Sequence, residues 1–226
     1  MENSPSAHKS IRSAGKVSAG TLVSRILGLV REQVFAYLFG AGMAADAFVA
    51  AFRIPNLLRD MFAEGALSAA FIPTLTQKLT KEGRSEAYRV AQIFLSFLLS
   101  VVTLIVVAGI IFAPEVVELI AGGFGDVPGK LSLTTDLARI MMPFLLLVSM
   151  AALVMGILNS LGIFGVPAFA PMLLNLGMIF AGFFICPFFD PPIIGMAIGV
   201  ILGGLGQRLF QVPVALRQGF VPSLDF

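Results

Sequence analysis

Charged residues are scarce in this chain of 226 residues, of which Asp, Glu, Lys and Arg make up only 12%. Soluble domains carry about 25% charged residues, so this composition excludes a chain whose whole surface faces water. Hydrophobic residues reach 58% and the mean hydropathy is +0.95. A membrane-spanning helix needs about 20 apolar residues, and the sequence has material for roughly six of them. It therefore predicts an all-α integral membrane protein.

Residues that commonly carry catalysis or bind metals are nearly absent. The sequence has one cysteine, Cys186, one histidine, His8, and no tryptophan. Cys186 therefore has no partner for a disulfide or a thiolate metal site. Neither a phosphate-binding GxxxxGK[ST] loop nor an HExxH motif nor a serine–histidine pair occurs. We expect no enzymatic activity, metal or cofactor, and the small net charge of +2 predicts no nucleic-acid partner.

A polar tail, residues 1–16, precedes one predicted lobe of six transmembrane helices, residues 17–226. Two prolines, Pro55 and Pro73, are expected to kink the second helix. A glycine-rich, acidic link, residues 114–136, is expected between the third and fourth helices. The predicted helices cover residues 17–39, 46–79, 90–112, 137–161, 166–184 and 193–216.

Lysines and arginines alternate between the two sides of the predicted lobe. The tail, the link after the second helix and the C-terminal end are basic. In the first, third and fifth links, Lys130 is the only lysine or arginine. Short loops rich in lysine and arginine stay in the cytoplasm. Both ends of the chain are therefore expected in the cytoplasm, which requires an even number of spans.

Ionisable residues within the apolar stretches are concentrated in the first two predicted helices. A charge at bilayer depth costs about 2.5–3.5 kcal/mol, so such residues usually face the bundle interior or a water-filled cavity. At about 100° per residue, the polar residues of each helix share one face. Two neighbouring helices with one polar face each predict a shared hydrophilic cleft. Its predicted lining residues are Ser24, Arg25, Arg31, Glu32, Arg53, Asn56, Arg59, Asp60 and Glu64.

Such a cleft would attract anions, because four arginines outnumber three acids and guanidinium groups suit phosphate oxygens. A single arginine can instead extend its head group to the membrane interface. It can also pair internally, as Arg25 with Glu32 or Arg53 with Asp60. Asn159, near the end of the fourth predicted helix, is a candidate either for capping that helix end or for lining the cavity.

Two sequence runs resemble the N-terminal signature of the MurJ (MviN) family of lipid II flippases. They are SRILGLVRE at residues 24–32 and FGAGMAADAFVAAFRIPNLLRDMFAEGALSAAFIP at residues 39–73. GILNS at 156–160, VPAFAPMLLN at 166–175 and FDPP at 189–192 extend the similarity. It covers nearly the whole chain after the tail.

The resemblance implies a two-lobed fold of the multidrug/oligosaccharidyl-lipid/polysaccharide exporter superfamily, of which this chain would be the N-terminal lobe without the second one. It further implies that lipid II, an undecaprenyl-pyrophosphate-linked peptidoglycan precursor, is moved from the cytoplasmic to the periplasmic leaflet of the bacterial inner membrane by alternating access. The implied partners are lipid II, membrane lipids and the second lobe of the same protein.

Cavity residues of that family correspond by motif to Ser24, Arg25, Arg31, Glu32, Asp46, Arg59, Glu64 and Asn159. Glu32 replaces an aspartate that is common there, and Asp60 stands where a second basic residue often occurs, so Asp60 receives no phosphate role. Our hypothesis is that Arg25, Arg31 and Arg59 hold the pyrophosphate while the acids balance the arginines. A cation-coupled exporter of drugs or other lipid-linked oligosaccharides, and a non-transporting membrane scaffold, remain as alternatives.

Overall fold

The computed structural model describes residues 5–61 and 71–223, and their regular structure is entirely helical. Two short 3-10 helices, η2 (Gly122–Asp126) and η3 (Cys186–Phe188), interrupt the α-helices. The α-helices are α1 (Pro5–Phe39), α2 (Met43–Arg59), α3 (Ile72–Lys81), α4 (Arg84–Ile111), α5 (Ala113–Ala121), α6 (Lys130–Met141), α7 (Phe144–Ser160), α8 (Gly165–Phe169), α9 (Met172–Phe184) and α10 (Ile193–Arg217).

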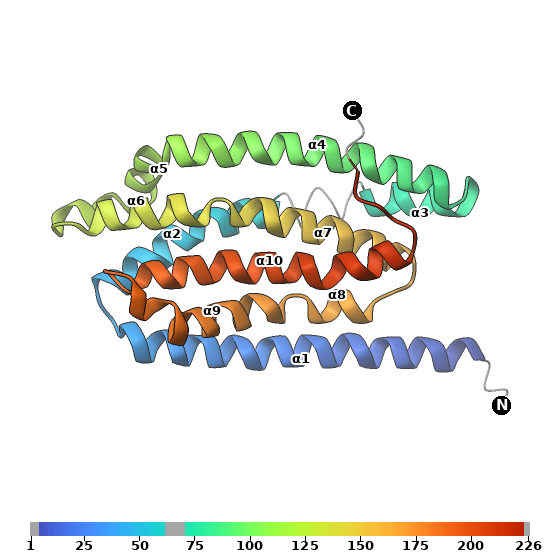
Figure 1. The fold of residues 1–226 in the computed structure, drawn as a ribbon, viewed down its shortest axis with the longest axis horizontal. Coiled ribbons are helices and arrows are strands. Elements are labelled where there is room, and N and C mark those ends of the chain that lie inside the picture. Colours follow the sequence, from blue (N-terminus) through green and yellow to red (C-terminus); the bar gives the residue numbers. More distant parts are fainter. Residues whose placement is uncertain (1–4, 62–70, 224–226) are drawn as a thin grey trace.

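The long helices lie side by side in an elongated bundle (Figure 1). α10 lies near its middle and packs against α9 on one side and α7 on the other. α1 packs against α8 and α9 at one edge, and α4 packs against α3 and α7 at the opposite edge. α2 contacts α6, α7 and α10. The charged second helix is therefore held next to the central helices of the bundle.

Four helical segments of the described residues are long and apolar enough to cross a membrane: residues 84–111, 130–160, 165–184 and 193–217. They correspond to the third to sixth helices predicted from the sequence. α1 and α2 are not among them, because charged residues interrupt α1 and because α2 has only 17 residues. The two helices that differ from ordinary membrane spans are thus the ones predicted to carry the site.

Glycines allow α9 and α10 to approach closely. A Cβ atom added to Gly177 would lie 2.6 Å from the backbone nitrogen of Gly203, and one added to Gly203 would lie 2.6 Å from Leu174 Cα. Any larger residue would push the two helices apart. Small residues at such contacts are typical of helix packing in membranes. This contact holds α10 in place, and with it the α10 side chains that reach the site.

Prolines divide the predicted helices more often than expected. Pro55 lies inside α2, as predicted. Pro73 lies in the first turn of α3, directly after residues outside the described part of the chain, so the kink expected there stays a prediction. Pro143 separates α6 from α7, and Pro171 separates α8 from α9. Residues 62–70, which belong to the second predicted helix, lie outside the described part of the chain.

The link predicted at residues 114–136 is largely helical, so its description as a connecting loop is wrong. It contains most of α5, all of η2 and the first turns of α6. α5 packs against α6 and buries Val117, which gives this short segment a stabilising apolar contact. At the N-terminus, α1 begins at Pro5, inside the predicted tail.

Candidate functional site

Residues of α1, α2 and α9 surround a cavity of about 370 Å³, called here the α1–α2 cavity. Its polar lining consists of Arg31, Glu32, Arg53 and Asn56, so it brings together four of the predicted site residues. The remaining wall is apolar and mostly aromatic. It is formed by Phe35, Phe48, Val49, Phe52 and Met178.

Arg31 and Glu32 form an ion pair at the wall of the α1–α2 cavity. The Arg31 Nη2 atom donates to Glu32 Oε1 at 3.2 Å, and the side chains are 23% and 64% exposed. An ion pair with so exposed a partner contributes little to stability. The guanidinium of Arg31 is more enclosed than the carboxylate of Glu32, so an anion entering the cavity can compete with Glu32 for it.

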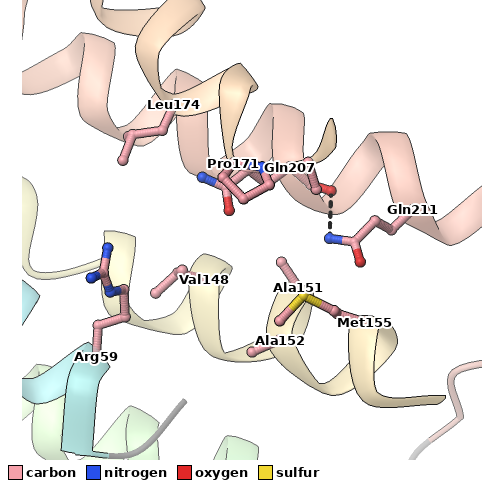
Figure 2. A pocket seen from close by; sticks show the side chains of 10 residues that line it. Arg59, Val148, Ala151, Ala152, Met155, Pro171, Leu174, Gln207 and Gln211 are labelled. Atoms are coloured by element: carbon pink, nitrogen blue, oxygen red, sulfur yellow. Dashed lines mark hydrogen bonds between the residues drawn. The ribbon is translucent and has the colours of Figure 1, made fainter. Parts of the chain in front are cut away.

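A second cavity, of about 160 Å³, lies between α7, α10 and the ends of α2 and α9, and is called here the α7–α10 cavity (Figure 2). Arg59 reaches into it from the end of α2, and Gln207 and Gln211 of α10 lie across from α7. The rest of the lining is apolar. It is formed by Val148, Ala151, Ala152, Met155, Ala170, Pro171 and Leu174.

Asp60 pairs with Arg59 at the rim of the α7–α10 cavity. The Nη2 and Nε atoms of Arg59 donate to the same carboxylate oxygen of Asp60, at 2.7 and 3.1 Å. The Arg59 side chain is 26% exposed and that of Asp60 49%. Asp60 is thus the more exposed member of the pair and orients Arg59 from outside the cavity.

The two cavities adjoin each other along the bundle. Asn56 of the α1–α2 cavity lies one helical turn before Arg59 of the α7–α10 cavity, both on α2. Met178 and Leu174 are likewise one turn apart on α9. Three arginines therefore line the two adjoining cavities: Arg31 and Arg59, which are half-buried, and Arg53, which is exposed.

Ser24 and Arg25 are not part of either cavity. The Ser24 carbonyl accepts a hydrogen bond from the Asn175 side-chain amide at 3.0 Å, which ties α1 to α9. Arg25 is exposed. The ion pairs considered from the sequence, Arg25 with Glu32 and Arg53 with Asp60, differ from those observed, in which Glu32 and Asp60 each pair with the arginine that directly precedes it.

Asp46 lies in the first turn of α2 and makes an ion pair outside both cavities. Lys130 Nζ, at the start of α6, donates to Asp46 Oδ2 at 2.6 Å and also lies 4.0 Å from the centre of the Phe124 ring. The Lys130 side chain is 11% exposed, whereas that of Asp46 is 57% exposed. This pair joins α2 to α6, so Asp46 acts on the packing of the lobe rather than on a cavity.

The last two predicted site residues are Glu64 and Asn159. Glu64 lies outside the described residues. Asn159 is half-buried in the last turn of α7, and its carbonyl accepts a hydrogen bond from the Gly162 nitrogen at 2.9 Å. It follows Met155 on the same helical face, one turn beyond the α7–α10 cavity.

Sequence reasoning missed three polar residues: Gln207 and Gln211, which line the α7–α10 cavity, and Lys130, which pairs with Asp46. The glutamines are uncharged and lie in a glycine-rich apolar helix, so a search for ionisable residues passes over them. Their four-residue spacing, which places both on one helical face, was the available signal. Lys130 falls in the glycine-rich segment that was predicted to be a link between helices. The available signal was that Lys130 is the only basic residue in this otherwise acidic segment.

Apolar spans around arginine-lined cavities define a polytopic membrane protein with a cationic interior. The family model of the lipid II flippase MurJ matches residues 35–226. The chain belongs to this family, which confirms the resemblance seen in the sequence.

Curated relatives agree with this assignment. The chain is 43% identical over 197 residues to a probable lipid II flippase MurJ of Buchnera aphidicola subsp. Acyrthosiphon pisum, covering 87% of this chain and 39% of the relative. It is 41% identical over 210 residues to a probable lipid II flippase MurJ of Vibrio cholerae serotype O1, covering 90% and 40%. The lipid II flippase MurJ of Burkholderia cenocepacia is 39% identical over 208 residues, covering 92% and 40%.

A solved structure shares the fold. It is that of a lipid II flippase MurJ in an inward closed conformation, with a TM-score of 0.69 and 28% sequence identity, covering 89% of this chain and 42% of that one. The chain thus spans about two fifths of the length of the proteins it matches.

Proposed function

We propose that this chain forms the N-terminal six-helix lobe of a transporter that flips lipid II from the cytoplasmic to the periplasmic leaflet of the bacterial inner membrane. The observation that carries the proposal is the position of Arg31, Arg53 and Arg59, which come from two helices and line two adjoining cavities. Membership of the lipid II flippase family supports the nature of the cargo. Alternating access requires the second lobe, which we take as the partner of this one.

In this proposal the membrane is crossed six times. α1 and the segment that contains α2 and α3 provide the first two crossings, and the four apolar segments provide the rest. The basic residues Lys78, Lys81 and Arg84 around the turn between α3 and α4 support a cytoplasmic position for that turn. Both ends of the lobe then face the cytoplasm.

The arginines act in this mechanism as a receptor for the pyrophosphate of the lipid. Guanidinium groups donate paired hydrogen bonds to phosphate oxygens, and they do so more strongly where surrounding apolar walls exclude water. The phenylalanines of the α1–α2 cavity supply such walls. Arg53, which lines the α1–α2 cavity, joins Arg31 and Arg59 in this role in place of Arg25, which lines neither cavity. The prenyl chain stays in the lipid phase, which avoids placing it in a polar cavity.

Glu32 and Asp60 have a complementary role. Each pairs with an arginine at 3.2 or 2.7 Å and is more exposed than its partner. When the pyrophosphate arrives, the arginines exchange these carboxylates for phosphate oxygens, and when it leaves, the carboxylates return. The drug-exporter and scaffold alternatives are not favoured, because three arginines but only one acid line the two cavities and the matched relatives are named as lipid II flippases.

Binding of lipid II to the complete protein in detergent or nanodiscs tests the proposed cargo. We expect saturable binding that weakens as salt is raised, because screening reduces the attraction between guanidinium and phosphate. Inorganic pyrophosphate should compete with lipid II, whereas undecaprenol, which has the same chain without phosphate, should not. Equal binding of undecaprenol and lipid II would remove the basis of the proposal.

A further inference from the structure

The wall of the α7–α10 cavity contains two buried amide side chains that the proposed pyrophosphate contacts leave unused. Gln207 is 7% exposed and Gln211 1% exposed. They lie one helical turn apart on α10, and both line the cavity that Arg59 enters from the other end (Figure 2). A cationic group and two neutral amides thus share one small space.

Gln211 has an unmet hydrogen-bonding capacity. Its Nε2 atom donates to the Gln207 carbonyl at 3.3 Å, but its Oε1 atom is buried and accepts no hydrogen bond from the described residues. Leaving a buried acceptor unpaired costs about 1–3 kcal/mol, and such groups are rare in native proteins. Gln211 lines the cavity, so a rotation of its side-chain amide would bring this oxygen to a donor that occupies the cavity.

The size and lining of the cavity restrict the occupant. Its volume is about 160 Å³, and a cavity of about 150 Å³ is known to hold one benzene ring. One six-membered ring therefore fits. Apolar residues of α7, among them Val148, Ala151 and Met155, form one wall and provide a surface for the C–H face of a ring. The polar edge of the ring would meet the glutamines.

We propose that the α7–α10 cavity is a subsite for a pyranose ring joined to the pyrophosphate. In this arrangement Arg59 contacts the phosphate nearest to the sugar, and Gln211 Oε1 accepts a hydrogen bond from a hydroxyl or N-acyl amide group of the sugar. Gln207 supplies a second amide on the same edge. This inference rests on the proposed function, since the sugar is reached through the pyrophosphate, and it adds recognition of the head group beyond its charge.

Two lipids separate the sugar contribution from the phosphate contribution. One is lipid II with a short prenyl chain, and the other is the same prenyl pyrophosphate without sugars. In the complete protein, Gln211→Leu and Gln207→Ala should each weaken binding of the sugar-bearing lipid about tenfold and change binding of the sugar-free lipid less than about twofold. The matched control is Gln77→Leu, at an exposed position of α3 outside both cavities, and it should change neither affinity.

Two other outcomes of these binding measurements would contradict the proposed sugar subsite. An equal loss for both lipids would assign the glutamines a purely structural role, and no loss for either would mean that only water fills the cavity. The unsubstituted protein provides a test without any variant, because it should bind the sugar-bearing lipid at least about tenfold more tightly. Similar affinities would overturn the subsite but leave the proposed function standing, whereas binding of neither lipid would overturn both.

Discussion

Arg31→Gln and Arg59→Gln are each expected to slow lipid II flipping by the complete protein about tenfold to a hundredfold. Glutamine keeps a hydrogen-bonding side chain but removes the positive charge. The loss of a hydrogen bond to a charged group corresponds to about 1.5–3 kcal/mol, which gives this range of rates. Flipping can be measured in proteoliposomes as the appearance of labelled lipid II in the outer leaflet.

Two controls isolate the effect of the cavity charge. Arg89→Gln removes a charge from an exposed position of α4, and it should leave flipping unchanged. Asp60→Asn combined with Arg59→Gln removes both members of the ion pair, so that an unpaired Asp60 carboxylate cannot cause the defect. Normal flipping by both single arginine variants would show that these arginines do not bind the cargo.

Asp46→Asn is expected to destabilise the lobe by about 2 kcal/mol, because it leaves the ammonium group of Lys130 buried without its carboxylate partner. The cost stays below that of a fully buried pair, since Asp46 is itself 57% exposed. The measurement is the thermal or denaturant unfolding of the complete protein, with binding of lipid II recorded in parallel.

A second substitution at the same pair distinguishes packing from cargo binding. Lys130→Met removes the buried charge while keeping an apolar side chain of similar length next to Phe124. Combined with Asp46→Asn, it should recover much of the lost stability, and any loss of lipid II affinity in Asp46→Asn should be reversed with it. Recovery of stability without recovery of affinity would mean that Asp46 contacts the cargo directly.

The sequence predicted the class of protein and the identity of the polar helices. Apolar stretches are recognisable because a membrane-spanning helix must bury its backbone polar groups in its own hydrogen bonds. Charges within such stretches are costly, so Arg31, Arg53 and Arg59 could be singled out without coordinates. The structure places all three on cavity walls.

Other features depended on packing between segments far apart in the chain. The face on which Arg25 lies depends on how α1 packs against α8 and α9, and this contact leaves Arg25 exposed. The partner of Asp46 is 84 residues away, and no local pattern connects it to Lys130. The unpaired oxygen of Gln211 depends on which helices cover α10. These properties arise from tertiary contacts, which helical periodicity does not describe.

Thiol labelling tests most directly whether the arginine-bearing face of α2 lines a hydrated cavity. The single thiol of this chain, Cys186, is buried, and burial raises its pKa, so it contributes little background to labelling once any thiols in the rest of the complete protein are replaced by serine. Asn56→Cys places a thiol between Arg53 and Arg59, whereas Leu104→Cys places one on the exposed, apolar surface of α4.

With a membrane-impermeant maleimide applied from the cytoplasmic side, Asn56→Cys should react readily and Leu104→Cys should not, because acyl chains exclude water from the outer surface of α4. Added lipid II should slow the reaction of Asn56→Cys. If Asn56→Cys stays unlabelled in every conformation that the protein samples, or if lipid II leaves its labelling unchanged, the arginines do not line a water-filled binding cavity.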